Sequence, residues 1–269
     1  MKKLSILWFT FVCTLMLSFQ VLAADVVTID VPITVDYDAE QEFIRTLNKA
    51  RTEKGLNELP MNSFLMQEAE LRAAEIILDL AHGHPDRRVN DYSFAEASGS
   101  MYLAGECLAA NRSSSGEFSC NQFLEETTNG HSASMLCPTA QACGVGIVNY
   151  RETTYVCYKY VDKACFVYPY TYEDMKNDPF PTSGKEDKLY KIDMLRSNIE
   201  FAVGEVPQTG MEYGDTKEYT YVYIQNAYKP VREYVLDWLR IPASQVTITG
   251  DEHFTVSGNK IKANSLGTG

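Results

Sequence analysis

Positive charge is scarce in this sequence, and the shortage excludes one class of partners. Lysine and arginine together number 24, against 36 aspartates and glutamates, for a net charge of −12. An acidic protein repels the phosphates of nucleic acids and of anionic lipid headgroups. We therefore expect no nucleic-acid partner, and an acidic surface that favours solubility and attracts cations.

Long apolar runs are absent beyond the N-terminus. Lys2 and Lys3 precede a mostly apolar stretch from Leu4 to Leu22, and VLAA at 21–24 offers small residues for cleavage. This is the pattern of a secretory signal peptide, and the run is barely long enough for a membrane anchor. We predict that residues 1–23 are removed and that the mature chain is secreted and extracellular. Without the two lysines, 22 basic residues face 36 acidic ones, a net charge of −14.

The chain lacks any Cys-x-x-Cys motif, which argues against a thiolate zinc site. Apart from Cys13 in the predicted signal peptide, all cysteines lie between positions 107 and 165. Six clustered cysteines in an exported chain predict three disulfides, for which 15 connectivities exist. Pairing of sequence neighbours would join Cys107 with Cys120, Cys137 with Cys143, and Cys157 with Cys165.

Regular periodicity is missing from Cys165 to Lys188, a stretch rich in proline, tyrosine, aspartate and lysine. We interpret 169–189 as a linker between a first domain at 36–168 and a β-rich domain at 190–269. Residues 24–35 are an extended lead-in, because Pro32 confines their strand-like alternation to a sheet edge.

The first domain mixes helices and strands. Helical spacing and capping residues predict helices at about 39–54 and 63–81, the first with Asp38 and Gln41 as its capping box and the second capped by Asn62. A third helix is predicted after Ser114. The sequence CGVGIVNYRETTYVCYKY predicts a hairpin that turns near Arg151. We expect an α+β fold with helices packed on a small antiparallel sheet.

The second domain carries short β-rich runs separated by turn residues, at 218–226, 233–241, 245–250, 253–256 and 259–263. This spacing predicts a small all-β sandwich. The final SLGTG lacks a closing hydrophobic run, so we expect the chain to be part of a longer protein.

Histidine is rare, with four in the chain, and two of them flank a glutamate at the ends of predicted elements. His82 follows the second helix, Glu106 follows a glycine, and His131 follows another glycine, so all three are expected at the rim of the scaffold. Two imidazoles and a carboxylate suit a divalent cation such as zinc, with one position left for water or substrate. The alternative for His82 is a favourable charge at a helix C-terminus.

The motifs LNKARTEKGLNEL, LDLAHGHPD, AGEC, NGHSASML and CGVGIVNYRETTYVCYKY occur in this order. From Phe43 to Tyr160 the chain resembles the bacterial branch of the CAP superfamily (cysteine-rich secretory proteins, antigen 5 and pathogenesis-related proteins). The resemblance implies an α-β-α sandwich with a central cleft, in which some members hold a divalent cation. His82, Glu106 and His131 match the cleft residues.

The sequence departs from that pattern in several places. His84 stands where an arginine is usual, and we interpret it as a solvent-facing loop residue and a secondary ligand candidate. Cys107 replaces an asparagine. The second cleft glutamate is not placed, and Glu125 and Glu126 are the nearby candidates. The C-terminal VTITGDEHFTVSGNKIKANSLGTG resembles bacterial immunoglobulin-like modules more faintly.

Three functions fit these observations. The first is an extracellular binding or interaction module for a protein, lipid or glycan, with a divalent cation as the candidate ligand of its cleft. The second is a metal-dependent hydrolase or protease with Glu106 as base or ligand. Lipid or sterol binding is the third, and only some members of the resembling family imply it. The sequence contains no Gly-x-Ser-x-Gly elbow beside Ser132 or Ser134, so we lean toward a protein that is not an enzyme.

Overall fold

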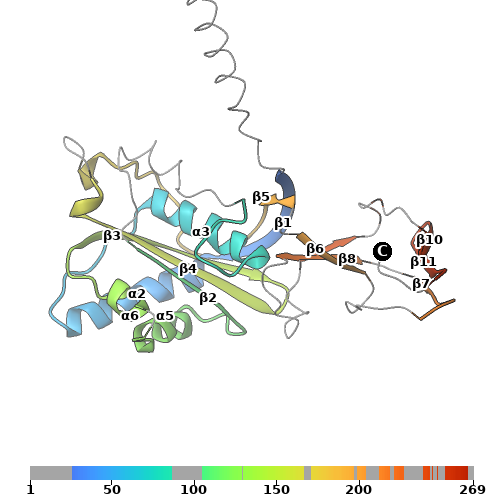
Figure 1. Cartoon of the computed structure of the whole chain (residues 1–269). Helices are drawn as coiled ribbons and strands as arrows, with labels where there is room; N and C mark the ends of the chain where they lie inside the picture. The colour runs from blue at the N-terminus through green and yellow to red at the C-terminus, as the bar shows by residue number, and fades with distance from the viewer. Residues whose placement is uncertain are drawn as a thin grey trace, which may run out of the picture.

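The computed structural model describes residues 26–86, 105–128, 130–166, 171–196, 199–203, 212–218, 221–226, 239–242, 244, 247 and 252–265. The predicted signal peptide at 1–23 lies outside these ranges. Figure 1 shows a layered body of helices and sheet, from which short strands extend toward the C-terminal end. Within the described residues, no helix is both long and apolar enough to cross a membrane.

A five-stranded sheet in which every pairing is antiparallel forms the centre of the first domain. Its strands follow the order β2-β4-β3-β1-β5. Their bounds are β1 Val26–Asp36, β2 Gly105–Asn111, β3 Ala140–Tyr150, β4 Thr153–Asp162 and β5 Lys185–Leu195.

Helices cover both faces of this sheet (Figure 1). Helix α3 packs on one face, where its apolar residues join those of β1, β3, β4 and β5 in one core cluster. The other face carries the remaining helices, which form a second cluster with β2, β3 and β4. The helices are α2 Tyr37–Glu53, α3 Ser63–Leu78, α5 Gly116–Glu125 and α6 His131–Met135. The predicted α+β fold with an α-β-α sandwich is confirmed.

Two glycines of β3 allow α3 to lie directly on the sheet. A Cβ atom at Gly144 would lie 2.2 Å from the Leu65 carbonyl carbon, and one at Gly146 would lie 2.4 Å from that of Ala69. Real side chains do not approach this closely, so only glycine fits at both positions. The motif CGVGIV therefore fixes the distance between helix and sheet.

The helix starts follow the local chemistry, with small shifts from prediction. Asp36 rather than Asp38 caps α2, by accepting a hydrogen bond from the Ala39 amide at 3.2 Å. Asn62 caps α3 as predicted. Helix α3 ends at Leu78, three residues earlier than predicted, so His82 lies beyond the helix and not in its last turn. The predicted hairpin is β3 and β4, with Arg151 at φ 57° in the turn.

The sheet extends further than the predicted domain boundaries allowed. β1 pairs with β5 along its whole length, from Val26 opposite Leu195 to Asp36 opposite Lys185. The predicted lead-in at 24–35 therefore contains a sheet strand, and β5 crosses the predicted boundary at 190. β1 pairs with β3 only at Thr34 and Val35, so at Pro32 it has a single neighbour, as a proline requires.

The predicted linker at 169–189 is also packed against the first domain. It contains the short 3₁₀ helix η2 Tyr172–Asp174, and Met175 is buried beside α3. The Asn177 side chain accepts a hydrogen bond from the Ser63 amide at 3.0 Å. These contacts tie the segment to the start of α3.

The C-terminal part contains two small antiparallel sheets. One has the order β6-β8-β9 and the other β10-β11-β7. The bounds are β6 Ile199–Val203, β7 Thr216–Glu218, β8 Tyr221–Asn226, β9 Leu239–Pro242, β10 Phe254–Ser257 and β11 Lys260–Ala263. Most of the run predicted at 245–250 lies outside the described residues, and the immunoglobulin-like character of this part stays a prediction.

Among the residues that the structure describes, none of the six cysteines is disulfide-bonded, which differs from the three predicted disulfides. Cys157 lies in the core cluster on the α3 face, whereas Cys107, Cys120 and Cys143 lie in the cluster on the opposite face. The predicted pair of Cys157 with Cys165 is wrong in this fold. Cys165 contacts Asp162, and Cys157 lies five strand residues away from Asp162, about 16 Å along β4. A disulfide needs Cα atoms within about 7 Å.

Candidate functional site

Glu106 lies on the edge strand β2 and faces α3. Its Oε2 atom is 3.1 Å from Arg72 Nε and 3.7 Å from Lys159 Nζ, and its Oε1 atom is 3.0 Å from His82 Nδ1. Lys159 is its register partner on β4. Burial raises the pKa of the Glu106 carboxyl, but the His82 hydrogen bond and the charges of Arg72 and Lys159 outweigh it and lower the pKa below its ordinary value. Glu106 is therefore held as a carboxylate.

Gly105 is needed just before this glutamate. A Cβ atom at position 105 would lie 2.5 Å from the Tyr160 ring carbon Cε1. Tyr160 is also the register partner of Gly105 on β4. The glycine in AGEC therefore lets β2 pair with β4 beside the Tyr160 ring, which brings Glu106 opposite Lys159.

Arg72 connects α3 to the loop that carries His82. Its side chain, 1% exposed, binds Glu75 at 2.9 Å and donates to the carbonyls of Ala81 and Gly83. Burial would lower the pKa of Arg72, but Glu106 and Glu75 raise it above its ordinary value. This buried cation fixes the loop on both sides of His82.

His84 belongs to the same network, and the prediction of a solvent-facing loop residue was wrong for it. Its side chain is 11% exposed, and Nδ1 lies 2.7 Å from Glu75 Oε2. The Glu75 carboxylate contacts both Arg72 and His84. The second contact holds the His84 ring in a mostly buried position.

His131 occupies a different environment from the other two candidate residues. It begins α6 directly after Gly130, which has a positive φ of 87°. Its ring packs edge-on against Phe123, with 5.0 Å between centroids. His131 Nδ1 lies 3.7 Å from Glu126 Oε2. Of the two glutamates predicted nearby, Glu126 is thus the one with a contact to His131, while Glu125 ends α5.

The structure therefore separates the predicted trio: His82 contacts Glu106, whereas His131 contacts Glu126, which is outside the trio. Glu106 faces α3, whereas the next residue, Cys107, points the other way and its Sγ lies 3.9 Å from the His131 carbonyl oxygen. This follows from the alternation of side chains along a strand. In the described part of the chain, no three His, Cys, Asp or Glu side chains are grouped as they would be around a metal ion.

The residues around Glu106 do not suit a divalent cation in this arrangement. A cation at this carboxylate would lie beside the fixed charges of Arg72 and Lys159, both 1% exposed. Like charges at this range repel strongly when water does not screen them. Arg72 and Lys159 already supply the positive charge that Glu106 needs.

Residues 44–161 match the model of the family described as "CAP: Cysteine-rich secretory protein family". This segment belongs to the CAP family. The match runs from α2 to β4 and includes His82, Glu106 and His131. β1, β5 and the C-terminal strands lie outside it.

Solved structures resemble the CAP domain distantly. A cysteine-rich secretory protein from Staphylococcus aureus is 12% identical, with a TM-score of 0.32, and the match covers 46% of this chain and 38% of that protein. Venom allergen-like protein 4 of Schistosoma mansoni is 16% identical, with a TM-score of 0.34, covering 54% and 94%. The CAP domain of enterococcal PrgA is 16% identical, also at 0.34, covering 54% and 72%. The search of curated proteins finds no match.

Arg72, Glu75 and Lys159 were not predicted from the sequence, although Arg72 and Lys159 each left a signal. Arg72 interrupts an otherwise apolar face of α3 between Ala69 and Ala73, and Lys159 interrupts the apolar run VCYKYV. A lone charge within a buried run is rarely tolerated without a partner of opposite charge. Both residues could have been paired with an acidic group on that ground.

Proposed function

We propose that the CAP domain is an extracellular binding module that contacts its partner at the rim where His82 emerges. The observation that supports this is the way the network holds that histidine. Glu106 binds its ring and Arg72 binds the carbonyls next to it, while 66% of the His82 side chain stays exposed. An exposed ring on a fixed loop is ready to bind with little loss of conformational entropy.

The same contacts argue against the hydrolase alternative. A general base works best when its pKa lies near the working pH. The pKa of Glu106 is instead lowered, because His82, Arg72 and Lys159 stabilise the carboxylate against burial. A carboxylate so stabilised takes a proton poorly and is better suited to positioning His82.

Site-specific photo-crosslinking tests the binding proposal. A benzophenone amino acid would replace His82, and a matched control would carry it at Glu53, an exposed position on α2. With the extracellular fraction and envelope of the producing cells, we expect a crosslinked product from position 82 that excess unlabelled protein removes. Equal products at both positions, or none at position 82, would contradict the proposal. The crosslinked species identifies the partner as protein, lipid or glycan.

A second experiment distinguishes binding from catalysis. Peptide and ester substrates would be screened with and without chelator for the wild type and Glu106→Gln, alongside metal analysis of the wild type, His82→Ala and His131→Ala. We expect that none of the substrates is hydrolysed in a metal-dependent way. We also expect that the wild type carries no stoichiometric metal ion that is lost in both His82→Ala and His131→Ala. Chelator-sensitive hydrolysis that disappears in Glu106→Gln would instead establish the enzyme.

A further inference from the structure

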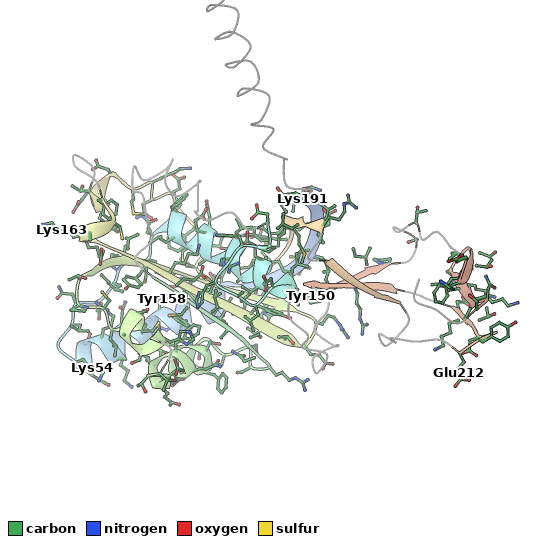
Figure 2. The ribbon with its side chains drawn as sticks, viewed as in Figure 1. Lys54, Tyr150, Tyr158, Lys163, Lys191 and Glu212 are labelled. Carbon is green, nitrogen blue, oxygen red and sulfur yellow. The ribbon has the colours of Figure 1, made fainter. Side chains whose placement is uncertain are left out.

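Two cysteines lie beside the open end of the β3–β4 hairpin. Ala140 of β3 pairs with Asp162 of β4. Cys137 lies three residues before Ala140, and Cys165 lies three residues after Asp162. Both segments leave the sheet at this point, because the Ala140 amide donates to the Cys137 carbonyl in a turn and Cys165 ends a 3₁₀ helix, so the two cysteines lie at the same end of the hairpin. In Figure 2, Lys163, which begins the 3₁₀ helix η1 Lys163–Cys165, lies at the far end of the hairpin from Tyr150.

Hydrogen bonds place both sulfur atoms around one carboxylate. Cys137 Sγ lies 3.3 Å from Thr139 Oγ1, and the Thr139 hydroxyl donates to Asp162 Oδ2 at 3.3 Å. The Cys165 thiol donates to Asp162 Oδ1 at 3.5 Å. The buried Arg51 donates to the Cys137 carbonyl at 3.0 Å and holds that segment in place. The two thiols therefore belong to a single connected cluster.

Cys165 is buried in a third apolar cluster, and burial raises the pKa of its thiol to about 11, so only Cys137 differs in its surroundings from the other four cysteines. Cys107, Cys120, Cys143 and Cys157 are buried in the two apolar clusters, and burial raises the pKa of each thiol. Cys137 is partly exposed. Partial burial raises the pKa of its thiol, but hydrogen bonds from Thr139, Tyr160 and Ala140 bring it below the ordinary value. Cys137 is the cysteine best placed to react first.

We propose that Cys137 and Cys165 form a reversible disulfide that closes the open end of the β3–β4 hairpin. A disulfide requires Cα atoms within about 7 Å of each other, and the contacts with Asp162, direct for Cys165 and through Thr139 for Cys137, hold the two segments next to each other. This pairing replaces the predicted partners of both cysteines. It rests on the hairpin geometry and is independent of the function proposed for His82.

The oxidant is a disulfide of the glutathione class. The Cys137 thiolate attacks one sulfur of oxidised glutathione, the sulfur–sulfur bond breaks, and one glutathione thiolate leaves. The Cys165 thiol loses its proton and attacks Cys137 Sγ, which expels the second glutathione. Overall, the two protein thiols are oxidised by two electrons, and oxidised glutathione is reduced by the same two electrons. The two glutathione thiolates that are released take up the two protons.

Peptide mapping tests the pairing in the whole secreted chain. The reduced protein would be equilibrated with oxidised and reduced glutathione, alkylated and digested with trypsin. Cys165 lies in the tryptic peptide 164–176, and Cys137 lies in 113–151 with Cys120 and Cys143. We expect these two peptides to be linked, fragmentation to assign the link to Cys137, and two of the six thiols to be lost.

Three variants complete the test. Cys137→Ser and Cys165→Ser should each abolish the link, whereas Cys157→Ser, which removes a buried thiol on the α3 face, should leave it intact. A lasting glutathione adduct on Cys137 with Cys165 still free would overturn the proposal, because it would show that the sulfurs do not meet. A link from Cys165 to Cys120 or Cys143, or two unreacted thiols at every glutathione ratio, would overturn it as well.

Discussion

Several charges inside this fold are balanced by partners of opposite charge, and Arg72 shows how many groups one such residue can connect. It meets the carboxylates of Glu75 and Glu106 and the carbonyls on both sides of His82. Removing one partner of a buried ion pair leaves an uncompensated charge, which typically costs about 3–5 kcal/mol. The orientation of His82 and the stability of the domain therefore depend on the same side chain.

Glu40 is a buried acid whose charge is poorly compensated. Its side chain is fully buried on α2, Oε1 accepts a hydrogen bond from the Ile147 amide at 3.1 Å, and Oε2 has no hydrogen-bond partner among the residues that the structure describes. Burial and the nearby charge of Glu70 raise its pKa well above the ordinary value, although the Ile147 amide and Lys188 lower it. The folded protein therefore keeps a proton on Glu40 at pH values where the unfolded chain has lost it.

This predicts that the free energy of unfolding falls as the pH rises above the ordinary glutamate pKa of about 4.3, by at most about 1.4 kcal/mol per pH unit for this one proton. Glu40→Gln, which keeps the acceptor for Ile147, should remove this contribution. Its stability relative to the wild type should then increase from pH 5 to pH 8 in urea denaturation. Glu53→Gln on the exposed side of α2 is the control. Parallel curves for wild type and Glu40→Gln would show that Glu40 is ionised in the fold.

The residues of the candidate site could be found from sequence only in part. Glycines and a helix end marked His82, Glu106 and His131, and the structure brings the first two into contact. Because side chains alternate along β2, Cys107 and not Glu106 points toward the backbone of His131. The number of residues between Glu106 and His131 does not show this. Arg72 and Lys159 were missed because the spacing of apolar residues predicts which positions are buried, and it does not predict that a charged residue occupies one of them.

Among the elements, the contact of α3 with β3 tolerates the least change. A Cβ atom at Gly146 would lie 2.4 Å from both the Ala69 carbonyl carbon and its oxygen. These are backbone atoms, so no side-chain rotation can relieve the clash. We expect Gly146→Ala to lower the free energy of unfolding by about 3 kcal/mol, at the upper end of the usual cost of overpacking.

Gly83→Ala is the matched control, because no atom of the described residues lies within 4 Å of a Cβ atom there. Its effect should stay within about 0.5 kcal/mol. Chemical denaturation followed by circular dichroism measures both variants. A Gly146→Ala protein as stable as Gly83→Ala would mean that α3 can move away from the sheet at little cost.

The elements that sequence predicted are those with local signals. Capping residues and apolar spacing located α2, α3 and α5, and the turn at Arg151 located the hairpin. β5 was divided between a linker and a second domain, because the first four residues of this edge strand, KEDK, are all charged and only its later residues alternate between exposed and more buried positions. Its pairing with β1 joins segments more than a hundred residues apart in sequence, which no local pattern reports. The short α6 was missed because its five residues carry too little periodicity.

The whole first domain is larger than the segment that matches the CAP family. β1 and β5 lie outside residues 44–161, yet both contribute to the core beneath α3. Their buried members in that core are Ile29, Val31, Ile33, Val35, Ile192 and Met194. From the C-terminal part, Leu239 packs on the same cluster and the Arg240 amide donates to the Tyr150 hydroxyl at 2.8 Å.

These contacts predict which fragment can fold. Burying an aliphatic side chain contributes about 1.5–3 kcal/mol, so losing six of them removes about as much as the 5–15 kcal/mol that stabilises a typical domain. Residues 44–161 alone should therefore fail to melt cooperatively. Residues 26–195 keep the full sheet and lose the contacts that C-terminal strands such as β8 and β9 make with the first domain, so they should melt cooperatively at a temperature somewhat below that of the longer chain. Circular dichroism and calorimetry on both fragments make the comparison. Cooperative melting of 44–161 at the temperature of 26–195 would mean that the pairing of β1 with β5 is an accessory to the CAP domain and not part of its core.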